Sequence, residues 1–343
     1  MTDTSHKALR VKHNSPTSKS SHLYRPRHWM TWLILACLWL VVHLPYPVLL
    51  KLGNLLGALM YRFAGRRRHI AETNIRLAFP DLTGSQQKAL VKANFQANGM
   101  ALLEVGLSWW GNEKRLRRLM HIEGLEHIQQ ALEKGNGVIM LGGHFTSLII
   151  AGRLLALELL FNIVVKKAHN AVFEAVMRHY RLRQYQGLIN STDMRGMIRT
   201  LKKNQVLWYA PDQDFGHRAS VFAPFMGIPT STLTTTAGLA KLSKAPVIYI
   251  DFERLPGTQG YRLKLHPPLQ GFPSGDDTKD ARRVNALIEQ HVHEVPEQYL
   301  WMHRRFKTRP EGEPGLYGWA DKKHMRETQR RSPTDEAKHP SKR

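Results

Sequence analysis

Hydrophobic residues run without interruption over 138–141, and the glycines at 142–143 end the run. A short apolar run without polar alternation predicts a strand that is buried on both faces. His144 follows the glycines, and apolar positions over 145–160 predict a helix. The pattern therefore predicts that His144 lies at the carboxyl end of a buried strand, where α/β proteins place reactive groups. A lone histidine there more often caps a helix or packs in a core, so the rest of the chain must decide its role.

The chain beyond residue 160 alternates between strand and helix patterns. Strands are predicted at 162–166, 188–189, 205–210, 245–252 and 261–265. Helices are predicted at 171–182, 194–203, 232–242 and 281–294. Strands that alternate with helices indicate a largely parallel sheet covered on both faces. We therefore predict an α/β fold with a mostly parallel sheet flanked by helices.

Residues 69–134 carry mainly helical patterns. Thr83 and Ser85 predict the cap of a helix that extends to Gly99, and an apolar run follows at 100–110. Glu104 is embedded in that apolar run. It is interpreted either as a paired core carboxylate or as a catalytic group.

Two apolar runs near the N-terminus, at 29–42 and 48–64, have basic residues on both flanks. The first is short for a membrane span, which needs roughly 17–25 residues, and its tryptophans suit a membrane interface. We favour a single span or anchor followed by an interfacial helix; a shallow hairpin bent at 45–47 and a buried soluble helix are the alternatives. The predicted organisation is a disordered basic leader at 1–27, a membrane anchor and interfacial helix at 28–65, the main domain at 66–317 and a disordered basic tail at 318–343.

Charge narrows the classes of partner. The 343 residues include 50 Lys and Arg against 27 Asp and Glu, a formal net charge of +23. Such a balance favours nucleic acid, anionic lipid or a phosphorylated substrate. The sequence has no nucleic-acid-binding motif with interleaved aromatic residues, so we expect no nucleic-acid partner. Cys37 is the single cysteine and no zinc-type cluster occurs, so we expect neither an intrachain disulfide nor a metal site.

Polar clusters fall in three loops of the predicted α/β region. They are His144 with its two glycines, the segment 178–183 with Arg181 and Arg183, and the segment 210–216 with Asp212 and Asp214. If strands 138–141 and 205–210 are parallel neighbours, His144 and both aspartates share one edge of the sheet. A histidine and a carboxylate form a general-base pair that activates a hydroxyl, and arginines can hold phosphates. The segment 224–230 fits either a groove for an apolar substrate or a packed loop.

Several longer segments of the sequence point to a particular protein family more specifically than the single residues above. They include Asn74-Ile-Arg-Leu-Ala-Phe-Pro80, Gly143-His-Phe-Thr146, Arg181-Leu-Arg183, Asp193-Met-Arg-Gly-Met-Ile198, Trp208-Tyr-Ala-Pro-Asp-Gln-Asp214, and the segments 220–225 and 296–310. In this order they resemble the late acyltransferases of lipid A biosynthesis, over roughly residues 29–317. The ending at 303–310 is more similar to the lauroyl/palmitoleoyl type, which acts on Kdo2-lipid IV(A), than to the myristoyl type.

The resemblance implies a glycerolipid-acyltransferase-like fold, with residues 66–317 as the acyltransferase domain. It implies acyl transfer from acyl-carrier protein to the 3-hydroxyl of a hydroxyacyl chain on a Kdo2-lipid IV(A)-like anionic lipid. The implied location is the cytoplasmic face of the inner membrane of a Gram-negative bacterium, and no metal, cofactor or covalent acyl-enzyme is implied. By position, His144 matches the family's general base, Arg181 its active-site arginine and Asp212 its active-site aspartate. We expect Arg183 and Asp214 to contribute to substrate binding.

One position departs from the family pattern, in which Asp or Glu stands five residues after the histidine. Here that residue is Ile149. The first interpretation, which we favour, is an active acyltransferase with a substitute carboxylate. Asp212 is preferred among the candidates Asp212, Asp214, Glu104 and Glu158. The other interpretations are a weak or differently specialised acyltransferase, and a catalytically impaired relative that binds lipid or partner enzymes.

Overall fold

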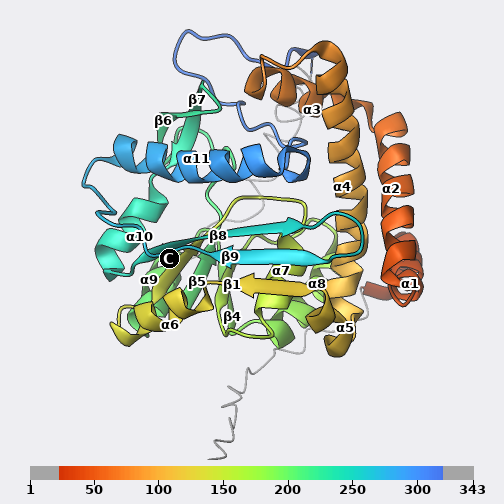
Figure 1. Ribbon diagram of the computed structural model, residues 1–343, viewed down its shortest axis with the longest axis horizontal. Helices are drawn as coiled ribbons and strands as arrows, with labels where there is room; N and C mark the ends of the chain where they lie inside the picture. The colour runs from red at the N-terminus through yellow and green to blue at the C-terminus, as the bar shows by residue number, and fades with distance from the viewer. Residues whose placement is uncertain (1–22, 320–343) are drawn as a thin grey trace, which may run out of the picture.

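The computed structural model describes residues 23–319, which are built around a seven-stranded sheet (Figure 1). Its strands are β1 (Met120–Glu123), β2 (Val138–Leu141), β3 (Asn162–Val165), β4 (Gly187–Asn190), β5 (Val206–Tyr209), β8 (Val247–Arg254) and β9 (Tyr261–Leu265). They lie in the order β1-β9-β8-β2-β5-β3-β4. Every neighbouring pair is parallel except β8 and β9. The predicted mostly parallel α/β fold is therefore confirmed.

Helices flank this sheet. They are α1 (Trp29–Val42), α2 (Tyr46–Phe63), α3 (Gly65–Ala78), α4 (Gly84–Trp110), α5 (Glu113–Arg118), α6 (Leu125–Glu133), α7 (Leu148–Leu155), α8 (Ala171–Gln184), α9 (Met194–Lys202), α10 (Thr235–Ser243) and α11 (Asp277–Glu294), with short 3-10 turns at Pro26–His28 and Pro296–Gln298. The central strands β2 and β5 are buried at every position. Continuous burial explains why their sequences are apolar without alternation.

The long helix α4 joins the N-terminal helices to the sheet. Thr83 caps it, and the side chain of Gln86 completes a capping box, as the predicted helix start requires. The two patterns predicted on either side of Gly99 form one continuous helix. A Cβ atom at Gly99 would lie 2.2 Å from the Gly53 carbonyl oxygen and 2.3 Å from the Gly57 nitrogen. Only a glycine therefore allows the backbones of α2 and α4 to approach this closely.

Helices α1 and α2 occupy the segment predicted to be a membrane anchor and an interfacial helix. α2 buries Leu49, Gly53 and Gly57, whereas α1 leaves most of its large apolar side chains exposed. Within residues 23–319, no helix combines the length and the hydrophobicity needed to cross a membrane, so the predicted span is not seen there. The predicted leader and tail fall outside the described residues, apart from 23–27 and 318–319.

Three local predictions are corrected. The segment 224–230 does not line the pocket; it is packed against the core, as one alternative held, but as part of a hairpin of β6 (Ser220–Phe225) and β7 (Ile228–Leu233) and not as a loop. Strand β1 lies in a region predicted to be helical; it alternates half-buried and exposed residues and pairs with β9. The helix predicted at 145–160 is confined to α7. The Thr146 amide donates instead to the Gln298 carbonyl at 2.7 Å, and Phe145 forms a bridge with Tyr299.

We expect Gly99→Ala to lower the free energy of unfolding by about 1–3 kcal/mol, because the added methyl group forces α2 away from α4. Thermal and urea denaturation measure this loss. Gly84→Ala is the matched control, since a Cβ atom there meets no heavy atom within 4 Å. Equal stability of the two variants would contradict the close helix contact.

Candidate active site

The site begins where β2 ends. Gly142 and Gly143 carry the chain out of the sheet, and a Cβ atom at Gly143 would lie 2.8 Å from the Phe145 ring. Glycine therefore allows the tight turn that presents His144 at the carboxyl edge of the sheet. The His144 side chain is 25% exposed, so part of its ring faces open space.

Asp212 follows β5, the parallel neighbour of β2, and it reaches His144. Its Oδ1 lies 2.5 Å from His144 Nδ1, and its Oδ2 accepts the His144 backbone N–H at 2.7 Å. The Asp212 side chain is almost completely buried. Burial opposes its ionisation, but the charge of His144, the hydrogen bonds from His144 and the nearby Arg305 hold the pKa of Asp212 at about 2. An ionised Asp212 favours the tautomer that carries the proton on Nδ1, which leaves Nε2 free to accept a proton.

The C-terminal segment supplies a buried layer behind Asp212. The Tyr299 hydroxyl is within hydrogen-bonding reach of both Asp212 and Arg305. Arg305 is 1% exposed and donates to neutral groups: the Ser231 carbonyl at 2.7 Å, Thr232 Oγ1 at 3.3 Å and Asn285 Oδ1 at 3.4 Å. Since a buried guanidinium needs a compensating charge, its attraction to Asp212 stabilises both groups.

Asp214 lies near this pair but has a different set of contacts. Its carboxylate accepts the Thr308 amide and hydroxyl, each at 2.7 Å, and the Gly216 amide at 2.9 Å. Lys307 Nζ is 3.6 Å away. The Asp214 amide donates to His303 Nε2 at 3.3 Å, and burial lowers the pKa of His303 to about 4. Asp214 therefore fastens the C-terminal segment to the loop that carries Asp212.

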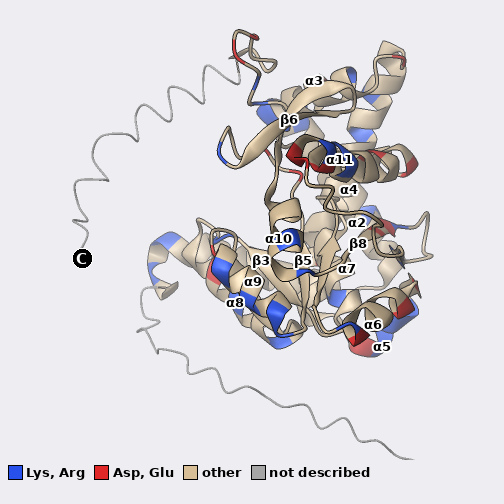
Figure 2. Ribbon diagram, turned by 90° about the vertical axis from the view of Figure 1, so that its left-hand side faces the viewer, with Lys and Arg blue, Asp and Glu red and all other residues tan. Residues whose placement is uncertain are grey.

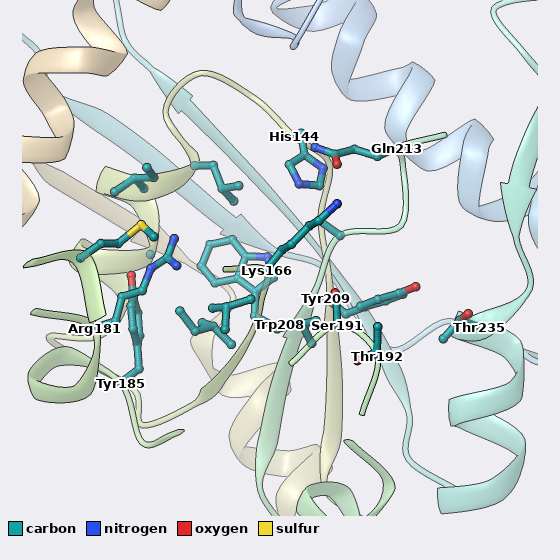
Figure 3. Close-up of a pocket in the computed structure, with 18 of the residues that line it drawn as sticks. His144, Lys166, Arg181, Tyr185, Ser191, Thr192, Trp208, Tyr209, Gln213 and Thr235 are labelled. Carbon is teal, nitrogen blue, oxygen red and sulfur yellow. The ribbon is translucent and has the colours of Figure 1, made fainter. Parts of the chain in front are cut away.

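A pocket of about 510 Å³ opens beside His144 (Figure 3). Most of its wall is apolar, and three cations, Lys166, Arg181 and Arg218, line it without any carboxylate. The remaining lining residues are Ser108, Trp109, His144, Leu148, Ile149, Gly152, Ile163, Val164, Val165, Met177, Gln184, Tyr185, Ser191, Thr192, Met194, Trp208, Tyr209, Ala210, Gln213, Phe215, Ala219, Leu233 and Thr235. Such a pocket suits a ligand with an apolar chain and a negatively charged group.

Of the two predicted arginines, Arg181 lines the pocket and Arg183 does not. Arg181 lies across the pocket from His144, beside Tyr185 (Figure 3), and burial lowers the pKa of its guanidinium. Within residues 23–319 the Arg181 side chain forms no hydrogen bond or ion pair, so its donors are available to a ligand. Arg183 is exposed, lies outside the pocket lining and is 3.1 Å from His179 Nε2.

Ile149 stands in the first turn of α7 and forms part of the pocket wall. Two other carboxylates that were considered as partners of His144 interact with other residues. Glu104 is buried and accepts Arg254 Nε at 2.6 Å and the Tyr261 hydroxyl at 2.8 Å. Glu158 forms an ion pair with Arg117. Among the four carboxylates considered, Asp212 is the one that contacts His144.

Several pocket residues were not predicted. Lys166 follows β3, Ser191 and Thr192 follow β4, and Gln213 follows β5. The rule that drew attention to His144, that carboxyl ends of parallel strands share one edge, would have found them. Tyr299 and Arg305 carried no such signal, because an irregular segment brings them to the site. Within residues 23–319, no group of His, Cys, Asp and Glu side chains is arranged to hold a metal ion.

Comparisons with known proteins give a consistent picture. The model of the bacterial lipid A biosynthesis acyltransferase family matches residues 17–308. The chain is 38% identical over 299 residues to the lipid A biosynthesis palmitoleoyltransferase of Escherichia coli, covering 87% of this chain and 97% of that protein. It is also 38% identical to the E. coli lauroyltransferase, covering 87% and 98% of the two chains. Identity to the E. coli myristoyltransferase is 29%, covering 84% and 90%, which agrees with the predicted resemblance to the lauroyl/palmitoleoyl type.

The lowered pKa of Asp212 predicts a pH dependence of stability. The carboxylate stabilises the folded chain above its ordinary pKa of 3.8, and this contribution is lost as the pH falls from about 4 towards the folded-state pKa of about 2. The contribution at neutral pH is about 2 kcal/mol. We expect Asp212→Asn to lower the free energy of unfolding at neutral pH and to weaken its dependence on pH below 4, as measured by urea denaturation. Asp81→Asn, at an exposed carboxylate, is the control; wild-type pH dependence in Asp212→Asn would rule out the lowered pKa.

Proposed function

Because the chain belongs to the bacterial lipid A biosynthesis acyltransferase family, we propose that it moves a fatty acyl chain from acyl-carrier protein to a lipid A precursor. The acceptor is the hydroxyl of a hydroxyacyl chain on a Kdo2-lipid IV(A)-like lipid. The general base is His144. The observation that carries this proposal is the 2.5 Å contact between His144 Nδ1 and the buried Asp212 carboxylate at the wall of an apolar, cationic pocket.

The chemistry follows from the free nitrogen of His144. Nε2 takes the proton of the acceptor hydroxyl while the hydroxyl oxygen attacks the thioester carbon. The tetrahedral intermediate collapses, the carbon–sulfur bond breaks, and the proton on His144 passes to the departing thiolate. An ester and a free thiol result, and the histidine returns to its neutral state. Asp212 holds the ring orientation and stabilises the imidazolium that forms between these steps.

Direct transfer of the acyl group from the donor to the acceptor hydroxyl agrees with the positions of the thiol and hydroxyl side chains of the protein. Cys37 is exposed on α1, outside the pocket lining. Ser147 is fully buried, and its hydroxyl points to the Phe252 carbonyl at 3.4 Å. Within residues 23–319 no Ser, Thr or Cys side chain forms a hydrogen bond with His144, including the hydroxyl residues of the pocket lining, so the proposed route has no covalent acyl-enzyme.

The pocket composition supports the choice of substrates. Its apolar wall accommodates acyl chains, and Arg181 supplies a partly desolvated cation for an anionic group. Arg183 contributes to lipid headgroup binding outside the pocket in this proposal, since its side chain is exposed. Asp214 contributes to substrate binding indirectly in this proposal, because its contacts with Thr308 hold the loop next to Asp212 in place.

The impaired-relative interpretation rests on Ile149, and the contacts of Asp212 argue against it. The function of the missing carboxylate is to hold the histidine in one tautomer and orientation. Asp212 makes two contacts with His144 that serve this purpose, and Tyr299 and Arg305 stabilise it from behind. We therefore propose an active enzyme in which Asp212 replaces the carboxylate at position 149.

The exposed apolar surface of α1 and α2 supports binding to the cytoplasmic face of the inner membrane. Large exposed side chains on these helices are Trp29, Met30, Leu33, Ile34, Trp39, Leu40, Val48, Leu55, Leu59 and Phe63. Basic residues, among them Arg62 and Arg66, lie at the end of α2 and beyond it. Apolar side chains beside cations suit insertion into an anionic membrane surface.

Acyl transfer provides the test of the catalytic proposal. With lauroyl-acyl-carrier protein and Kdo2-lipid IV(A), we expect the wild type to form the acylated product, detected by mass spectrometry. His144→Ala and Asp212→Asn should each lower kcat by about 10³–10⁴-fold, because each removes one half of the general-base pair. Ile149→Glu should change kcat by less than about tenfold, since Asp212 already orients the ring.

Two outcomes would overturn these assignments. An inactive wild type with an active Ile149→Glu variant would show that Asp212 does not replace the missing carboxylate. A His144→Ala variant as active as the wild type would remove the base from the proposal.

Membrane binding is tested separately with vesicles that contain anionic phospholipid. Leu33 and Leu40 lie seven residues apart on one face of α1, and both are exposed. We expect the double variant Leu33→Glu with Leu40→Glu to bind vesicles at least about tenfold more weakly, because two apolar side chains no longer leave water. Leu160→Glu, at a leucine exposed outside α1 and α2, is the control and should bind normally. Equal binding by all three proteins would exclude α1 as the membrane contact.

A further inference from the structure

Helices α9 and α10 both begin at the pocket. Met194, the first residue of α9, and Thr235, the first residue of α10, line its wall. The exposed residues among the lining mark the opening, and they include Thr192, Phe215 and Arg218. The surfaces of α9 and α10 therefore continue outward from the pocket opening.

This surface is predominantly basic, and the exposed Asp193 beside it caps the start of α9. Between residues 194 and 250 the only acidic residues are Asp212 and Asp214, and both are buried. The exposed Lys and Arg residues of the same stretch are Arg195, Arg199, Lys202, Lys203, Arg218, Lys241 and Lys244. Within residues 23–319 none of them forms an ion pair with a carboxylate. We call these seven residues the cationic face.

The cationic face lies far from the exposed apolar helices. Figure 1 places α9 and α10 at one end of the molecule and α1 and α2 at the other end. Figure 2 shows basic residues on α9 and α10 turned towards the viewer. The cationic face and the exposed apolar helices are therefore separate surfaces along the long axis of the molecule.

Exposed apolar side chains accompany the charges. Leu242 on α10 is 59% exposed, and Phe215 at the pocket opening is 47% exposed. Protein interfaces commonly combine an apolar contact with a charged rim that steers the partner into place. The composition of this face therefore suits an acidic protein better than a free anion.

We propose that the cationic face is the docking surface for the acidic carrier protein that delivers the acyl thioester. This inference rests on the proposed function, which requires a protein-bound acyl donor. The carrier sits on α9 and α10, and its thioester arm enters the pocket past Thr192 and Arg218. Attraction between the acidic carrier and the seven cations raises the rate of productive encounter, and salt weakens it.

Charge reversal on α9 tests the proposal. Arg199 and Lys202 are exposed, lie three residues apart and do not line the pocket. We expect Arg199→Glu with Lys202→Glu to lower kcat/KM for the acyl-carrier protein by at least about tenfold at low ionic strength. The loss should shrink as salt is added. With an acyl-pantetheine thioester that lacks the carrier protein, the same variant should match the wild type.

A matched control reverses two exposed cations at the same spacing on another helix. Lys279→Glu with Arg282→Glu changes α11, and it should leave kcat/KM for both donors unchanged. An equal loss with both donors in the α9 variant would show that these residues serve the pocket or the fold, and would overturn the docking surface. No loss with either donor would overturn it as well. A selective rise in KM for the lipid acceptor would instead assign the face to lipid headgroups.

Direct binding separates this proposal from the proposed function. Titration calorimetry with acyl-carrier protein should give a weaker complex for the α9 variant than for the wild type and the α11 control. If the wild type turns over neither donor, the proposed function fails. The docking surface is tested independently by the binding measurement: weaker binding of the carrier by the α9 variant than by the wild type supports it, and equal binding contradicts it.

Discussion

The hydrogen bond between the His144 ring and the buried Asp212 carboxylate is the interaction on which the site depends. Parallel pairing of β2 and β5 brings the two residues to one edge of the sheet. A buried carboxylate is costly unless it is paired, and His144, Tyr299 and Arg305 together provide that pairing. The sheet therefore positions the proposed catalytic pair, and the C-terminal segment supplies groups that favour the charged form of Asp212.

The replacement at position 149 is understandable within this arrangement. Ile149 lies in the apolar pocket wall together with Leu148 and Gly152. A position at which the resemblance implies a carboxylate here extends the apolar wall of the pocket. In the proposed mechanism Asp212, in the loop after β5, orients the histidine instead. The pocket wall is thus apolar at position 149 while the contact between His144 and Asp212 is present.

The sequence predicted the parts of the fold and site that follow local or periodic rules. Strands β2, β5 and β9 lie where the apolar pattern placed them, and the shared edge of His144 and Asp212 followed from parallel pairing. The hairpin of β6 and β7 was missed because Pro224 and Pro229 suggested a turn-rich loop. Tyr299 and Arg305 could not be placed, since no periodicity relates an irregular segment to a sheet edge almost a hundred residues earlier.

The central claim is that Asp212 fixes His144 as the tautomer with its proton on Nδ1, which leaves Nε2 as the base. Nitrogen-15 NMR of labelled histidines measures this directly, without substrate, by comparing wild type with Asp212→Asn. At a pH at which the imidazole is neutral, we expect its proton on Nδ1 in the wild type and loss of this preference in the variant. A wild-type His144 protonated on Nε2, or one identical in the two proteins, would contradict the account.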